Sequence, residues 1–68
     1  MHLTIETEQE VDGRWIAEIP EIPGVMLYGQ TRDAAIRAVQ ALALRVLSDR
    51  VENGDDLPLL TELTFNAA

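Results

Sequence analysis

Residues 18–31 constrain the fold of this chain more than any other stretch, because two prolines, two glycines and a threonine punctuate its apolar residues. Proline cannot donate a hydrogen bond to a strand ladder, so Pro20 is expected to end the strand before it. The Pro23-Gly24 pair is typical of a turn into a further short strand. The Gly-Gln-Thr triplet that closes the stretch is expected to end this strand and start a helix, with Thr31 as its N-cap.

Period-two alternation of apolar and polar residues predicts strands on both sides of this stretch. Asp12-Gly13 is typical of a hairpin turn, and Gly54 of the residue that follows a helix. Residues 66–68 are expected to fray. The expected elements are strands at residues 3–8, 14–19, 25–28 and 60–65, and a helix at residues 32–52. The faces expected to turn inward carry Leu3, Ile5 and Thr7, then Trp15, Ala17 and Ile19, and finally Thr61, Leu63 and Phe65.

The element order β-β-β-α-β predicts one α+β domain over residues 1–68. Crossovers between parallel strands are right-handed, so we expect a four-stranded mixed sheet in the order 3-2-1-4, with the last strand parallel to the first and one face covered by the helix. So short a chain builds only a thin core. The chain has no cysteine that could form a stabilising disulfide, and self-association is the expected substitute.

The net charge of the chain limits the kinds of molecule that it is expected to bind. The net charge is −7, from 12 acidic residues and 5 basic ones, all five of which are arginine. A phosphate backbone would be repelled by such a surface, so direct binding of nucleic acid is not expected. The charge is compatible with a basic partner and equally with simple solvation. The longest nearly apolar run, residues 38–44, is too short for a membrane span, and the first residues do not resemble a signal peptide, so we expect a cytoplasmic protein.

Two sets of apolar residues fall outside the predicted core. Leu44 and Val51 lie one heptad apart beside the apolar stripe of the helix. Ile16, Met26 and Tyr28 fall on the sheet face that a single helix leaves open. Both sets are predicted contacts with a partner or a second subunit, and the alternatives are scattered exposure for the first set and a solvated face for the second.

The sequence contains few candidates for catalytic or metal-binding residues. His2 is the only histidine and has no neighbouring cysteine, so a terminal, exposed residue is expected rather than a ligand. Glu6 and Glu18 are expected to be neighbours on adjacent strands, where Arg14 or solvent would offset their repulsion. Asp55-Asp56 is predicted to be a solvated loop. We therefore predict no catalytic residue, no metal and no cofactor, with a metal-dependent nuclease as a remote alternative.

Together, these motifs and this element order resemble the HicB-like antitoxin family. The matching pieces span roughly residues 3–58: the hairpin turn, the strand that Pro20 ends, the Pro-Gly turn, the Gly-x-Thr helix start and the alanine-rich helix at residues 34–47. The resemblance implies a partial ribonuclease-H-like fold without ribonuclease activity. It also implies an inhibitor that binds HicA, a small basic RNA-cleaving toxin, and that forms dimers or larger assemblies.

The chain departs from the family pattern in three places. Val25 stands where relatives often have cysteine, Ala34 stands where an acidic residue is common, and no DNA-binding domain follows within the sequence. The leading hypothesis is a short antitoxin-like module that neutralises a basic HicA-type toxin by direct binding. The alternative is a stand-alone homo-oligomeric domain of this type with another partner.

Overall fold

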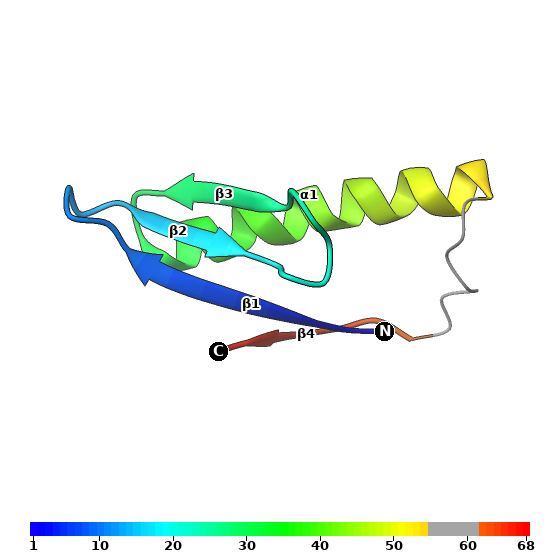
Figure 1. The fold of residues 1–68 in the computed structure, drawn as a ribbon, viewed down its shortest axis with the longest axis horizontal. Coiled ribbons are helices and arrows are strands. Elements are labelled where there is room, and N and C mark those ends of the chain that lie inside the picture. The colour runs from blue at the N-terminus through cyan, green and yellow to red at the C-terminus, as the bar shows by residue number, and fades with distance from the viewer. Residues whose placement is uncertain (55–61) are drawn as a thin grey trace.

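The computed structural model describes residues 1–54 and 62–68, which form one helix and a four-stranded mixed sheet (Figure 1). The sheet order is β3-β2-β1-β4; β1 pairs antiparallel with β2 and parallel with β4, and β2 pairs antiparallel with β3. The predicted α+β class, element order and strand order are confirmed. The elements are β1 (His2–Gln9), β2 (Trp15–Glu18), β3 (Met26–Gly29), α1 (Arg32–Asn53) and β4 (Thr64–Ala67).

The helix begins and ends on the residues that the sequence indicates. The Thr31 hydroxyl accepts the backbone N–H of Ala34 at 3.1 Å, as an N-cap does. At the other end Gly54 adopts a left-handed conformation (φ 67°), and its N–H donates to the carbonyls of Arg50 and Val51. Glycine takes this conformation without steric cost, so α1 ends there.

The predicted boundary of the last strand is partly wrong. Asn66 and Ala67 do not fray; they belong to β4 and lie opposite Thr4 and Ile5 of β1. The N–H of Ala68 donates to the Ile5 carbonyl at 2.9 Å, which extends this pairing by one residue. The other predicted strands shift by about one residue at their ends. Thr61 and the Asp55-Asp56 pair lie outside the described residues.

The core lies between α1 and one face of the sheet. The predicted inward residues of the first two strands are confirmed, except that Thr7 and Trp15 are only half-buried. Leu63 and Phe65 pack at the periphery of the core. Among the described residues, the buried apolar ones are Leu3, Ile5, Ala17, Ile19, Ile22, Val25, Ala35, Val39, Ala43 and Leu47.

The loop between β2 and β3 closes one end of this core. Ile22 and Val25 are buried, and three backbone hydrogen bonds link Ile19, Ile22 and Val25 to one another. The Glu21 carboxylate accepts the backbone N–H of Thr4 at 3.0 Å. Thr4 lies on the part of β1 that extends past its pairing with β2, so Glu21 satisfies a donor that β2 does not reach.

Glycine is required at position 29 for a reason that the sequence did not indicate. Gly29 ends β3, as the sequence predicts, but its φ is not positive, so no turn conformation requires a glycine there. A Cβ at this position would collide with the backbone of Ala34 and Ala35 in the first turn of α1. Glycine is therefore required for the close approach of the helix to the edge of the sheet.

Candidate functional site

The five predicted contact residues separate onto two sides of the molecule. Ile16, Met26 and Tyr28 lie on the sheet face that points away from α1, as predicted, and Met26 and Tyr28 are about half exposed. Leu44 and Val51 lie on one flank of α1 and are also about half exposed. They therefore form two separate surfaces rather than one site.

The open sheet face consists of two rows of side chains that cross three strands. Because directly opposite residues of paired strands share a face, the register places Glu8, Ile16 and Tyr28 in one row. The same argument places Glu6, Glu18 and Met26 in the other. The open sheet face thus combines three carboxylates with three apolar side chains: Glu6, Glu8, Glu18, Ile16, Met26 and Tyr28.

Glu6 and Glu18 are cross-strand partners, as the sequence suggested, but Arg14, one of the two expected means of offsetting their repulsion, does not pair with either of them. Arg14 binds Asp12, with Nε 2.8 Å from Oδ2, and this is the one ion pair among residues 1–54 and 62–68. The Arg14 guanidinium lies 4.5 Å from the centroid of the Tyr28 ring. Like charges directly opposite each other destabilise a sheet, and neither Glu6 nor Glu18 has an ion-pair partner among the described residues.

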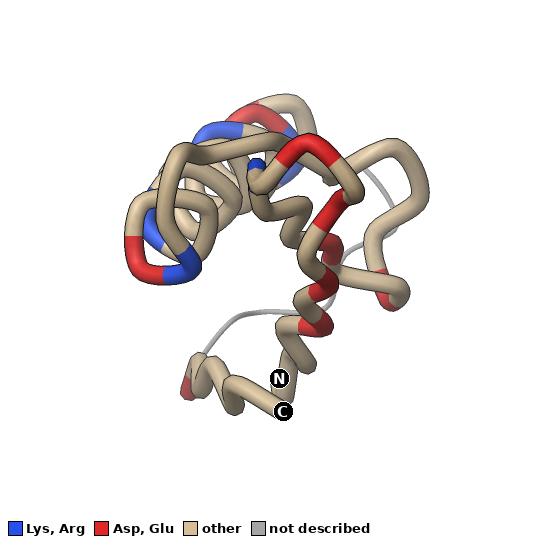
Figure 2. The backbone as a smooth tube through the Cα atoms, turned by 90° about the vertical axis from the view of Figure 1, so that its left-hand side faces the viewer, with Lys and Arg blue, Asp and Glu red and all other residues tan. Residues whose placement is uncertain are grey.

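Charge is divided between the helix and the rest of the chain. The helix carries four of the five arginines and three of the twelve acidic residues. In Figure 2 most blue segments accordingly lie on α1, and most red segments lie on the strands and loops. The helix surface therefore carries both signs with a small positive excess, and the net negative charge of the chain lies outside the helix.

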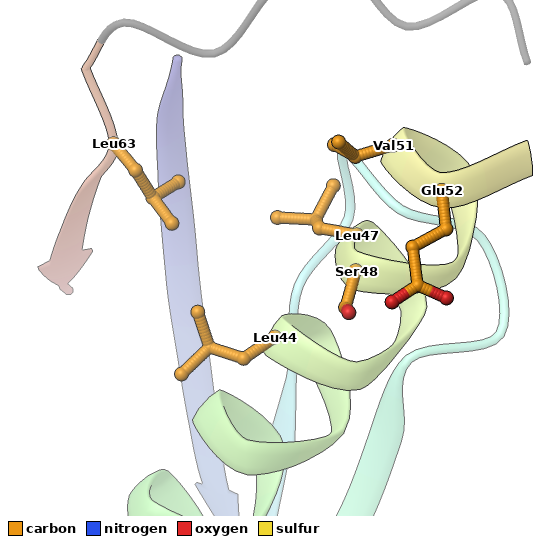
Figure 3. A pocket seen from close by; sticks show the side chains of 6 residues that line it. All are labelled: Leu44, Leu47, Ser48, Val51, Glu52 and Leu63. Carbon is orange, nitrogen blue, oxygen red and sulfur yellow. The ribbon is translucent and has the colours of Figure 1, made fainter. Parts of the chain in front are cut away.

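A second surface is an open groove of about 360 Å³ beside the C-terminal half of α1. Leu44, Leu47 and Val51 point from the helix toward Leu63, which precedes β4 on the other side of the groove (Figure 3). Ser48 and Glu52 complete the lining. The groove exists because α1 packs mainly on β3 and β2, whereas β4 lies along the far side of β1 (Figure 1).

Two carboxylates have pKa values below their ordinary range, and both lie near the ends of the sheet. The backbone N–H of Thr4 lowers the pKa of Glu21 by donating to its carboxylate. The backbone N–H of Arg14, assisted by its guanidinium, lowers the pKa of Asp12. Each carboxyl is ionised at neutral pH and holds a turn or loop in place, which is a structural role.

The carboxylates of the described residues are too dispersed to form a metal site. No group of three or more His, Asp or Glu side chains within the described part of the chain could hold a metal ion. The Glu6–Glu18 pair supplies two carboxylates, and His2 is exposed in the first position of β1. What the open face can do with this geometry is bind cationic groups.

Comparisons with family models, with curated proteins and with solved structures found no match to this chain. The described residues include no helix long and apolar enough to cross a membrane. The residues of the two surfaces are therefore the evidence that bears on function. The sequence predicted the five exposed apolar residues of these surfaces, whereas the place of Glu8 beside Ile16 and Tyr28 follows only from the strand register.

Proposed function

We propose that this chain is a non-catalytic binding module that uses its open sheet face to bind a basic protein. The partner that the sequence resemblance suggests is a HicA-type RNA-cleaving toxin, which an acidic antitoxin-like module would neutralise by direct contact. The observation that carries the proposal is the Glu6–Glu18 pair: two carboxylates face each other across β1 and β2, and Arg14 pairs with Asp12 instead.

A lysine or arginine of a partner would relieve this repulsion on binding. Neighbouring Glu8 adds a further negative charge, which would steer a cationic surface toward the face. The half-exposed Met26 and Tyr28 flank the carboxylates and would supply apolar contact area, and both residue types are enriched at interfaces. The toxin's RNA-binding cations would then be occupied by carboxylates rather than by phosphates.

The direct test is co-expression with the product of the adjacent reading frame, followed by calorimetric titration of the purified pair. We expect a complex at micromolar concentration whose affinity falls as salt rises, because salt screens the attraction between opposite charges. Failure of a basic adjacent product to bind would contradict the toxin assignment.

The Glu18→Gln variant tests which face binds. We expect its affinity for the partner to fall at least about tenfold, because a charge contact is lost. The free protein should gain about 0.2–1 kcal/mol of stability, because the like-charge pair is removed. Asp49→Asn removes the same charge from an exposed position on α1 and is the matched control, which should change neither quantity appreciably. Equal losses of affinity in both variants would show that net charge, rather than this face, determines binding.

A further inference from the structure

We infer that two copies of this chain associate through one flank of α1, with the two helices antiparallel and Leu44 close to the twofold axis. The flank consists of five exposed residues at alternating four- and three-residue intervals, which is the spacing of a helix–helix seam. These residues are Arg37, Ala41, Leu44, Ser48 and Val51. Glu52 lies beside the last of them and lines the groove with it.

Two copies of this flank are complementary to each other when the helices run antiparallel, and not when they run parallel. An antiparallel partner centred on Leu44 places Arg37 of each copy beside Val51 and Glu52 of the other. The same arrangement sets Ala41 opposite Ser48, and these small side chains allow the helix axes to approach closely. A parallel pair would instead set arginine against arginine and glutamate against glutamate, which costs free energy.

Charge also favours a second copy as the occupant of this flank. The exposed Arg37 and Glu52 have no ion-pair partner within residues 1–54 and 62–68, so both charges are available to a neighbouring molecule. The helix carries four arginines and three acidic residues, so two copies do not repel one another there. The open sheet face could not serve this purpose, because its three carboxylates would meet three more.

The gain on association is burial of the apolar groove. Leu44 and Val51 are 49% and 55% exposed in the single chain, and they stand with Leu47 and Leu63 around an open hollow. Residues 37–52 span about 22 Å of helix, which is a short seam. We therefore expect a dimer with a micromolar dissociation constant, below the affinity typical of larger obligate interfaces.

Sedimentation equilibrium of the full chain tests the association. From about 1 µM to about 1 mM the average mass should rise from that of one chain toward that of two. Leu44→Asp should hold the mass at one chain throughout. Val11→Asp makes the same apolar-to-acidic change at a fully exposed turn residue and should dimerise as the wild type does. A wild-type chain that stays monomeric, or a Leu44→Asp chain that still dimerises, would overturn the inference.

A charge exchange tests the antiparallel arrangement without altering the apolar residues. Arg37→Glu alone and Glu52→Arg alone should each weaken the dimer by about threefold to tenfold, because each places like charges together. The double variant restores opposite charges across the twofold axis and should recover most of the affinity. Additive loss in the double variant would exclude this arrangement.

Cross-linking gives a third readout, since the chain has no native cysteine. Under mild oxidation Leu44→Cys should form a disulfide-linked dimer rapidly and at low protein concentration, because the two thiols meet near the axis. Val11→Cys should cross-link only slowly, by random collision. Equal rates for the two variants would contradict the proposed seam. The inference is independent of partner binding by the open sheet face, and a Leu44→Asp monomer should still bind the basic partner.

Discussion

At the scale of single residues, glycines that look interchangeable in the sequence are required for different reasons. Gly13 and Gly24 have positive φ angles of 93° and 85° and turn the chain, and an added Cβ would meet no neighbour at either position. Gly29 has ordinary backbone geometry but no room for a side chain. Which of these reasons applies depends on where α1 packs against the sheet. The sequence around a glycine does not contain that information.

The close approach at Gly29 predicts a large effect of a small substitution. Gly29→Ala should destabilise the fold by about 2–3 kcal/mol, because the new methyl group forces the start of α1 away from β3. Gln30→Ala changes the exposed neighbour and should have little effect. Urea denaturation of both variants measures the difference, and similar midpoints would show that the helix start yields without cost.

The hydrogen bond from Thr4 to Glu21 predicts a contribution to stability that depends on pH. Since folding lowers the pKa of Glu21, its contribution is complete above the ordinary value of 4.5 and disappears as the pH falls through the lowered value. Glu21→Gln should therefore have a lower melting temperature than the wild type at neutral pH, and the difference should shrink in acid. Thermal melts from about pH 7 to about pH 3 would show this, and a constant difference would exclude ionisation as its cause.

At the scale of elements, β4 is the strand least supported by the rest of the fold. It pairs with β1, while α1 packs mainly on β3 and β2. Arg32, the first residue of α1, donates from Nε to the Thr7 hydroxyl at 3.3 Å and from Nη2 to the Ala68 carbonyl at 3.1 Å. A cation at the start of a helix opposes the helix dipole, so these two hydrogen bonds offset an unfavourable position. Arg32 thereby links the helix start to the end of β4.

Hydrogen exchange can test this link. Arg32→Ala should raise the exchange rates of the β4 amides about fivefold to tenfold and leave β2 amides unchanged, because local opening of β4 becomes easier. Arg45→Ala removes an exposed arginine in the middle of α1 and is the control. Unchanged protection of β4 in Arg32→Ala would show that pairing with β1 alone holds the strand.

At the scale of the whole molecule, turn and cap chemistry predicted the architecture correctly. Pro20 and Gly24 bound the β2–β3 connection and Thr31 starts the helix, so the element order followed from local signals. The strand order then needed only the crossover rule. The buried loop residue Ile22 and the Glu21–Thr4 hydrogen bond escaped prediction, because they join segments that are distant in sequence.

The sequence predicted which apolar residues belong to the candidate surfaces, but not how these residues are arranged in space. The apolar residues outside the core were identified from periodicity, and the structure assigns them to opposite sides of the sheet. Of the two expected means of offsetting the Glu6–Glu18 repulsion, Arg14 is engaged elsewhere, because Asp12 lies two residues away and competes for its charge with the more distant carboxylates. Such competition depends on distances that a sequence pattern does not contain.

The pairing of β4 with β1 also bears on how the chain folds. One edge of β1 has no neighbour until residues 64–67 reach it, and these residues lie some sixty positions further along the chain. Hairpins between β1, β2 and β3 form from nearby residues, whereas this last pairing must close a long loop and is slower. The free edge of β1 is therefore exposed until this pairing forms, and the acidic side chains along β1 would discourage other chains from adding to it.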